Sequence, residues 1–124
     1  MCIRDRFGGG VRTPELHSDS LEAQLANIPG LKVVLPATPA DAKGLLATSI
    51  REPDPVLFLE PLRGYRGIRG PVPNGEHLVP LGTARAARSG DDLVIISWSY
   101  QVELATPVAD SLASEGLSLS LIHI

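Results

Sequence analysis

The sequence predicts an α/β fold built on a parallel sheet, and three features of its first half indicate that class. Two short apolar runs, at residues 31–36 and 56–59, have the length and composition of buried strands. Between them, residues 38–50 show helical spacing of apolar side chains. A helix between two strands forms a crossover, and a crossover implies that the strands run parallel. Nearly continuous apolar strands also suit a sheet that is covered on both faces.

The flanking residues set the expected boundaries of these elements. The three glycines at 8–10 predict a tight loop, because glycine adopts backbone angles closed to other residues. Residues 18–28 predict a short helix that begins in a polar capping segment and stops at Pro29. Thr38 is the expected cap of the central helix, and Pro53 prevents that helix from continuing.

A second, smaller unit is predicted after a linker. From residue 61 to about 80 the composition shifts to Gly, Pro and Arg without a clear apolar period, which is typical of a linker. Residues 93–98 then predict a buried strand, and a helix is expected from about Val102 to Ala113, with Pro107 in its first turns. The apolar stripe expected on this helix consists of Leu104, Val108 and Leu112. One strand and one helix cannot bury a sheet face, so this unit is expected to be cut short.

The two ends of the chain do not follow this pattern. Residues 1–6 are polar and lack any cap or periodicity, and residues 119–124 stop just as a further strand begins. Both hexapeptides resemble translated sequencing-adapter ends, because a back-translation of one is similar to the reverse complement of the other. We therefore expect both to be cloning scars that do not belong to the native fold. The alternative is a genuine short N-terminus and a genuine terminal strand.

The composition is that of an ordinary soluble globular protein, with 44% hydrophobic and 20% charged residues. A formal net charge of -3 gives no electrostatic reason to expect nucleic acid or membrane as a partner. No apolar run approaches the roughly 20 residues that span a bilayer. The one cysteine, Cys2, lies in a suspected scar, and no secretory signal is visible, so a cytoplasmic-type compartment is the default.

Four segments carry a family resemblance. They are FGGGVRTPELHSDSLEA, IPGLKVVLPATPADAKGLLATSIREPDPVLFLEP, VPNGEHLVPLG and DDLVIISWSYQVELA. In this order and spacing they resemble the beta subunit of the decarboxylating component of thiamine-diphosphate-dependent 2-oxoacid dehydrogenases, most closely the pyruvate dehydrogenase type. The similarity covers residues 7–118, and the ordered set is far more specific than any one segment.

The resemblance implies a domain order for the chain. Residues 7–60 correspond to the C-terminal part of a pyrimidine-binding, transketolase-like domain, and residues 61–80 to the linker. Residues 81–118 correspond to the truncated start of a transketolase C-terminal-type α/β domain. With residues 1–6 and 119–124 as scars, the chain is expected to be an internal fragment.

The resemblance also implies an activity that the isolated fragment would not show. Relatives decarboxylate a 2-oxoacid, here expected to be pyruvate, on thiamine diphosphate and pass the acyl group to a lipoyl-bearing acyltransferase component. They form alpha2–beta2 heterotetramers in which the alpha subunit holds the diphosphate and magnesium. The glutamate that activates the coenzyme lies upstream, so no cofactor-binding residue is expected in this chain. The implied compartment is the bacterial cytoplasm, or the mitochondrial matrix in a eukaryote.

His17 is the residue that the resemblance marks as catalytic. Its position in ELHSDS matches the family's active-site histidine, which lies beside the thiazolium and the substrate. An imidazole suits this role because its pKa lies near working pH, so it can donate or accept a proton. From the residues alone, a loop histidine before a helix cap is more often exposed or structural, and only the family match favours catalysis.

A potassium site is implied at the end of the central helix. The last carbonyls of a helix lack intrahelical partners and carry partial negative charge. Relatives place a structural potassium ion here, and the matching residues are Ser49, Ile50, Glu52 and Asp54. Glu52 stands where many relatives have aspartate. The alternative is a solvated helix end with surface acids.

Other interpretations stay open. Branched-chain oxoacid and acetoin dehydrogenases fit nearly as well, whereas transketolase and deoxyxylulose-phosphate synthase fit ELHSDSLEA poorly. The arginine–glycine run at 63–70 could make the chain a non-catalytic RNA-binding or scaffold fragment, although a linker that packs on the partner subunit is favoured. The glycines at 8–10 lack the helix that a phosphate cradle needs. His77 is expected at the surface, and Trp98 in the core or an interface.

Overall fold

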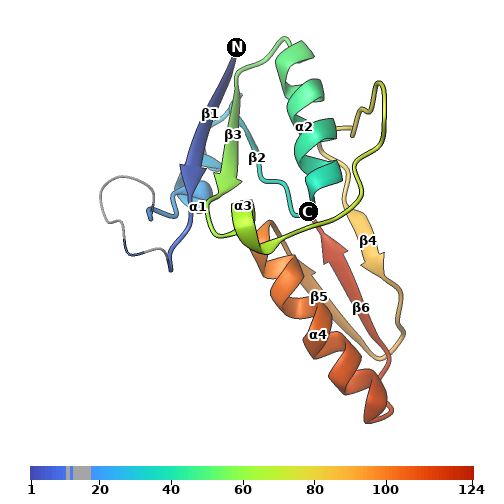
Figure 1. Ribbon diagram of the computed structural model, residues 1–124. Coiled ribbons are helices and arrows are strands. Elements are labelled where there is room, and N and C mark those ends of the chain that lie inside the picture. Colours follow the sequence, from blue (N-terminus) through green and yellow to red (C-terminus); the bar gives the residue numbers. More distant parts are fainter. Residues whose placement is uncertain (11, 13–17) are drawn as a thin grey trace. The chain divides into compact units, whose positions relative to one another are not determined.

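The computed structural model describes residues 1–10, 12 and 18–124. These fall into two compact units, Met1–Leu81 and Gly82–Ile124. Among these described residues, each unit has its own three-stranded sheet, with three helices in the first unit and one in the second (Figure 1). The predicted α/β class is therefore confirmed, while the domain boundaries drawn from the resemblance stay predictions.

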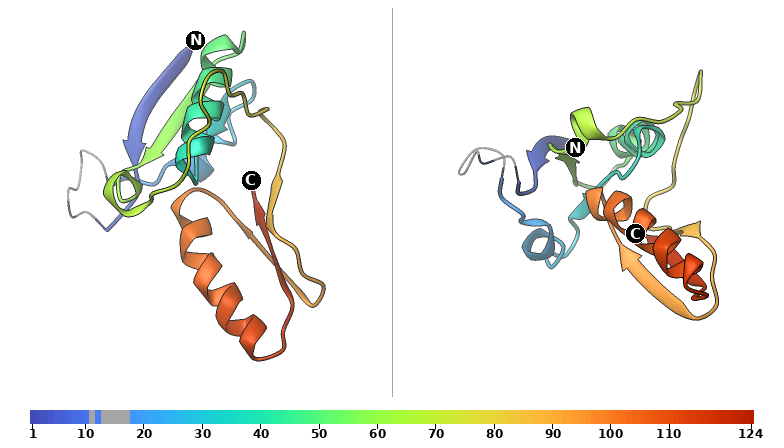
Figure 2. Two further views of the ribbon diagram at one scale, coloured as in Figure 1. Left: turned by 45° about the vertical axis from the view of Figure 1, so that its right-hand side comes forward. Right: turned by 60° about the horizontal axis from the view of Figure 1, so that its bottom comes forward.

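The first unit is built on a parallel sheet with the strand order β1-β3-β2. Its elements are β1 (Cys2–Phe7), α1 (Glu22–Leu25), β2 (Lys32–Val34), α2 (Pro39–Arg51), β3 (Val56–Pro61) and α3 (Gly64–Gly67). β2 and β3 pair in parallel with Lys32 opposite Val56, and α2 connects them (Figure 2). The predicted strand–helix–strand crossover is confirmed.

α2 begins at a reciprocal cap. The Thr38 hydroxyl accepts a hydrogen bond from the Asp41 amide, and the Asp41 carboxylate accepts one from the Thr38 amide, both at 3.1 Å. Pro39 occupies the first helical turn, where no amide proton is needed. The predicted Thr38 cap is confirmed, and the helix ends at Arg51, just before Pro53.

A cluster of aliphatic and aromatic side chains between α2 and the sheet forms the core of the first unit. Val56 is 1% exposed and Phe58 is fully buried, and Val34 and Leu45 pack against them. Fully burying a side chain of this size contributes about 1.5–3 kcal/mol. The contact of α2 with the sheet therefore stabilises the unit much more than any exposed ion pair does.

α1 is shorter than the helix predicted over residues 18–28, since it spans only Glu22–Leu25. The expected apolar stripe is largely exposed, with Leu21 at 44% and Ile28 at 48%. A short helix is stabilised mainly by burying one face, and this stripe has little to pack against among the described residues. The predicted length was therefore wrong.

The second unit contains a mixed sheet with the order β4-β6-β5. Its elements are β4 (Arg85–Arg88), β5 (Leu93–Ser97), α4 (Tyr100–Ser114) and β6 (Leu119–His123). β5 and β6 run parallel on either side of α4 in the chain, and β4 is antiparallel to β6. The sequence predicted only one strand here, because β4 lacks β-branched residues and residues 119–124 were set aside as a scar.

The buried face of α4 differs from the predicted stripe. Val102 is 6% exposed and Ala109 is fully buried, whereas Leu104 and Val108 are 45% and 50% exposed. The prediction favoured the larger side chains, but the small Ala109 side chain is the one that is fully buried. Pro107 lies inside the helix and not in its first turns, because α4 begins at Tyr100. Both predictions were wrong.

Five residues of each terminal hexapeptide lie in a strand. Residues 2–7 form β1, which pairs along the whole of β3, and residues 119–123 form the central strand of the second sheet. Strand pairing shows how these segments fold, but it does not show whether they were encoded by the gene or by a sequencing adapter. The assignment of residues 1–6 and 119–124 as scars therefore stays a prediction.

Thr38→Ala removes one half of the reciprocal cap on α2. We expect the full-length protein that contains this chain to lose about 1 kcal/mol of unfolding free energy, measured by urea denaturation. Thr48→Ala is the matched control, because the Thr48 hydroxyl donates only to the Gly44 carbonyl one turn earlier, at 3.0 Å. Its effect should stay within about 0.5 kcal/mol. Equal losses in both variants would count against the cap.

Candidate functional site

The stretch that contains His17 follows β1, which ends at the carboxyl edge of the first sheet. His17 lies outside the described residues, so its catalytic role stays a prediction. Described residues on the two sides of that stretch are joined, since the Gly8 amide donates to the Asp19 carbonyl at 2.9 Å. β1 ends at Phe7, so this bond closes the base of the loop at the edge where open parallel sheets bind ligands.

Two glycines shape the base of this loop. Gly8 and Gly10 have φ angles of 98° and 92°, which L side chains rarely adopt. Gly10 also lies against Arg63, because an added Cβ would be 2.9 Å from its Nη1 atom. Residues 8–10 themselves lie outside any helix or strand, as the predicted loop requires.

Glu60, at the end of β3, forms a cluster that the sequence did not predict. Its side chain is 14% exposed and lies 3.2 Å from Arg4. The Tyr65 hydroxyl donates to the Glu60 carboxylate, which ties α3 to β3. Burial and then this hydrogen bond raise the pKa of Tyr65 above its ordinary value. Glu60 and Tyr65 are five residues apart on either side of a turn, and no common sequence motif predicts a contact at that spacing.

Glu52 and Asp54, the two acidic residues predicted at the potassium site, both form ion pairs with Lys32. Lys32 Nζ lies 2.7 Å from a carboxylate oxygen of Glu52 and 3.1 Å from one of Asp54. The hydrogen bond to Glu52, followed by the one to Asp54, raises the pKa of Lys32. The sequence did not reveal this pairing, because Lys32 lies in β2, on the other side of α2 in the chain.

The other two predicted ligands lie in the last turn of α2. Ser49 is fully buried and its hydroxyl donates to the Leu45 carbonyl at 2.7 Å, while the Ile50 side chain is 68% exposed. Carbonyls in the last turn have no following helical amide to bond, and Pro53 supplies none. A hard monovalent cation could therefore use these backbone oxygens, whereas the nearby carboxylates are already paired with Lys32. In the ranges that the structure describes, no three His, Cys, Asp or Glu side chains gather as a metal site.

Two further residues were singled out from the sequence. His77 is half-buried and not a surface residue as predicted, because its imidazole lies over Gly44. Trp98 is 42% exposed and so does not lie in the core of this chain, while its other predicted place, an interface, stays a prediction. None of the described helices is long and apolar enough to cross a membrane.

The parallel sheet and its loop edge belong to a known class of domain. Residues 1–67 match the family described as transketolase, pyrimidine binding domain. This range includes β1 to β3, α2 and the base of the His17 loop. The chain belongs to this family.

Among individual proteins, the chain is similar to pyruvate dehydrogenase beta subunits. It is 49% identical over all 124 residues to the pyruvate dehydrogenase E1 component subunit beta of Bacillus subtilis (strain 168). The corresponding subunit of Staphylococcus aureus (strain Mu50 / ATCC 700699) is 47% identical over the same length. The chain spans 38% of the length of each of these curated relatives. The resemblance predicted from the four segments is confirmed.

A solved structure supports the fold. The protein described as split gene transketolase, inactive beta4 tetramer, matches with a TM-score of 0.70 over 83% of this chain and 33% of its own. Sequence identity is 18%, so the likeness concerns the fold alone. It confirms the transketolase-like architecture.

Lys32 leads to a prediction at alkaline pH. Because the pKa of Lys32 is raised in the folded state, its contribution to stability is complete below the ordinary lysine pKa and is lost as the pH rises through the folded value. Lys32→Met should therefore lower the urea midpoint near neutral pH, and this difference should vanish at strongly alkaline pH. The full-length protein should be measured in a Tyr65→Phe background, which removes a second group with a raised pKa. A difference that does not change with pH would contradict the pairing.

Proposed function

We propose that this chain is part of the beta subunit of a pyruvate dehydrogenase, which decarboxylates pyruvate on thiamine diphosphate and passes the acyl group to a lipoyl domain. The observation that carries the proposal is the 47–49% identity to pyruvate dehydrogenase beta subunits over all 124 residues. This similarity extends across both units, so it involves the order of the domains and not one shared motif. Branched-chain oxoacid or acetoin dehydrogenase is the alternative within the family.

His17 is the residue of this chain to which we assign a catalytic role. Support comes from the closed loop base between Gly8 and Asp19 at the carboxyl edge of the sheet. When bound, thiamine diphosphate supplies the carbon nucleophile and electron sink for decarboxylation. His17 would hold a proton near the substrate while the acyl group passes to the lipoyl arm.

The remaining parts of the site are proposed to come from the upstream part of the same beta subunit, which would carry the coenzyme-activating glutamate, and from other polypeptides. The relatives are named as beta subunits of an E1 component, which supports a partner subunit and further components. An alpha subunit in an alpha2–beta2 heterotetramer would hold the diphosphate and magnesium, and a lipoyl-bearing acyltransferase would take the acyl group. The proposed compartment is the bacterial cytoplasm, or the mitochondrial matrix in a eukaryote.

We also propose that a structural potassium ion binds at the end of α2. Two carboxylates, Glu52 and Asp54, face the single ammonium of Lys32, which leaves a net negative charge there. Arg51, in the same turn, is paired with Glu76 at 2.8 Å. The negative end of the helix dipole adds to this charge, and the carbonyls of the last turn offer oxygen ligands.

His17→Ala in the full-length beta subunit, assembled with its alpha partner, tests the catalytic role. We expect acyl transfer to a lipoyl domain to fall by about 10²–10⁴-fold, because a positioned proton donor is lost. Binding of thiamine diphosphate, followed by calorimetry, should stay unchanged. Ser20→Ala is the control, because the Ser20 hydroxyl contacts Glu22 in the same segment and should leave turnover near wild type. Unchanged turnover in His17→Ala would remove this residue from the site.

Potassium binding should appear as cation-specific stability. An ion that binds only the folded state raises the melting temperature by mass action, so the assembled protein should melt higher in potassium chloride than in choline chloride of equal ionic strength. Asp54→Asn should reduce this difference, since it removes negative charge beside the helix end. Glu22→Gln, in α1, should leave it unchanged. Equal melting temperatures in both salts would exclude the site.

A further inference from the structure

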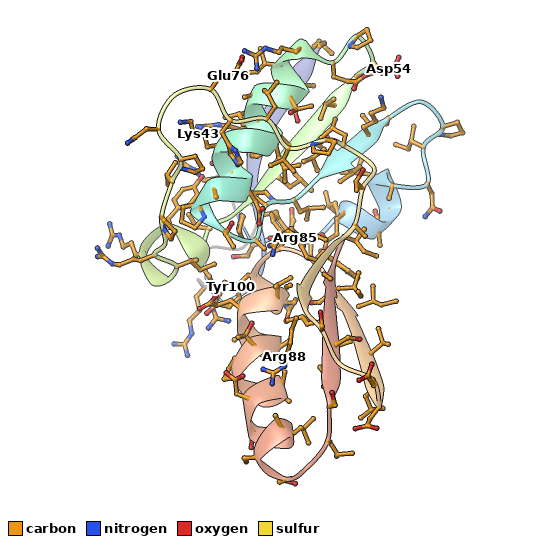
Figure 3. The ribbon with its side chains drawn as sticks, turned by 90° about the vertical axis from the view of Figure 1, so that its right-hand side faces the viewer. Lys43, Asp54, Glu76, Arg85, Arg88 and Tyr100 are labelled. Atoms are coloured by element: carbon orange, nitrogen blue, oxygen red, sulfur yellow. The ribbon has the colours of Figure 1, made fainter. Side chains whose placement is uncertain are left out.

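The segment that follows α3 runs along α2 and makes contacts that a simple linker would not need. Lys43 Nζ donates to the Pro73 carbonyl at 2.6 Å and to the Gly75 carbonyl at 2.7 Å. Beyond Gly75, the Glu76 carboxylate lies 2.8 Å from Arg51 in the last turn of the helix. Figure 3 shows Lys43 and Glu76 on the side of α2 where this segment passes. Contacts thus reach from the second turn of α2 to its end.

Gly44 is a point of close approach between this segment and α2. An added Cβ would be 2.5 Å from Val79 Cγ2 and 2.9 Å from His77 Cδ2, which is too close for either side chain to stay in place. Glycine inside a helix is about 1 kcal/mol less favourable than alanine. Close packing of the segment gives a physical reason for glycine at this position.

The last residues of the segment alternate in burial as an extended chain does. His77, Val79 and Leu81 are half-buried, whereas Leu78 between them is 47% exposed. Val79 and Leu81 pack against the core cluster that includes Leu45. The sequence did not reveal this, because three alternating positions are too few to give a recognisable period.

We propose that residues 73–81 form a latch that closes over α2 and opens separately from the rest of the first unit. The Arg51 and Glu76 side chains are 55% and 69% exposed, so their ion pair contributes little. The other contacts described above are two exposed hydrogen bonds from Lys43, the half-buried His77 beside Gly44, and the half-buried apolar side chains of Val79 and Leu81. α2, in contrast, packs over the fully buried Phe58.

Opening of the latch therefore needs less free energy than unfolding of the unit. The latch ends at Leu81, where the first unit ends. When closed, it fixes the point at which the chain leaves the first unit. When open, it exposes the Gly44 side of α2. This inference does not depend on the enzymatic assignment.

Cleavage after Glu76 by a glutamate-specific protease, in the native full-length protein, tests the latch. When opening and closing are fast, the cleavage rate follows the population of the open form. Lys43→Met removes both hydrogen bonds and should accelerate this cut about tenfold, whereas Lys43→Arg should accelerate it less. Gly44→Ala should also accelerate it, although helix propensity alone predicts the opposite sign.

Three controls keep the test specific to the latch. Gly67→Ala should leave the cleavage rate unchanged, because nothing lies within 4 Å of an added Cβ there. Val79→Ala removes the nearest of the atoms that alanine at position 44 would meet and leaves His77 in place, so the effect of Gly44→Ala should shrink, but not vanish, in that background. Hydrogen exchange of the α2 amides should stay slow in every variant. Unchanged cleavage in both Lys43→Met and Gly44→Ala, or α2 exchange that accelerates together with cleavage, would overturn the proposal.

Discussion

The contact between α2 and the β2–β3 pair is the constraint on which the first unit depends. Parallel strands cannot be joined by a tight turn, so the chain must return through a crossover long enough to pass along the sheet. Such a helix is stable because one face is buried, and Phe58 and Val56, at 0% and 1% exposure, supply that burial. The cap at Thr38 and the stop before Pro53 then fix where the helix begins and ends.

The same topology explains the charged cluster at the end of α2. In a parallel pair the amino ends of both strands lie at one edge, and Lys32 is opposite Val56 at that edge. α2 must return to the same edge before entering β3, so Glu52 and Asp54 arrive beside Lys32. The Lys32 amide also bonds the Pro55 carbonyl at 3.0 Å, which holds the three charged side chains in one place.

The parts of this fold that depend on local pattern could be predicted, and those that depend on distant contacts could not. The β-branched residues of β2, the Thr38 cap and the prolines after α2 act within a few positions, and they predicted the crossover correctly. The Lys32 cluster and the Lys43 contacts join residues far apart in the chain, and no local pattern reports them. α4 was misjudged because apolar size indicated Leu104, whereas Ala109 is the fully buried side chain. His17 could be proposed only from resemblance.

The end of α2 and the base of the stretch that contains His17 lie at opposite edges of the first sheet, and this separation bears on the roles proposed for the two sites. Ser49 to Asp54 lie where α2 meets the amino end of β3, whereas the loop base at Gly8 lies at the carboxyl end of β1. β3 has six residues, which span about 20 Å in an extended strand. At that distance a bound cation is screened from the loop and cannot share a proton or a substrate with it. A cation at the amino edge, as proposed, would therefore stabilise α2 and the sheet, while the proposed chemistry would stay at the carboxyl edge, where a neighbouring polypeptide would supply the coenzyme.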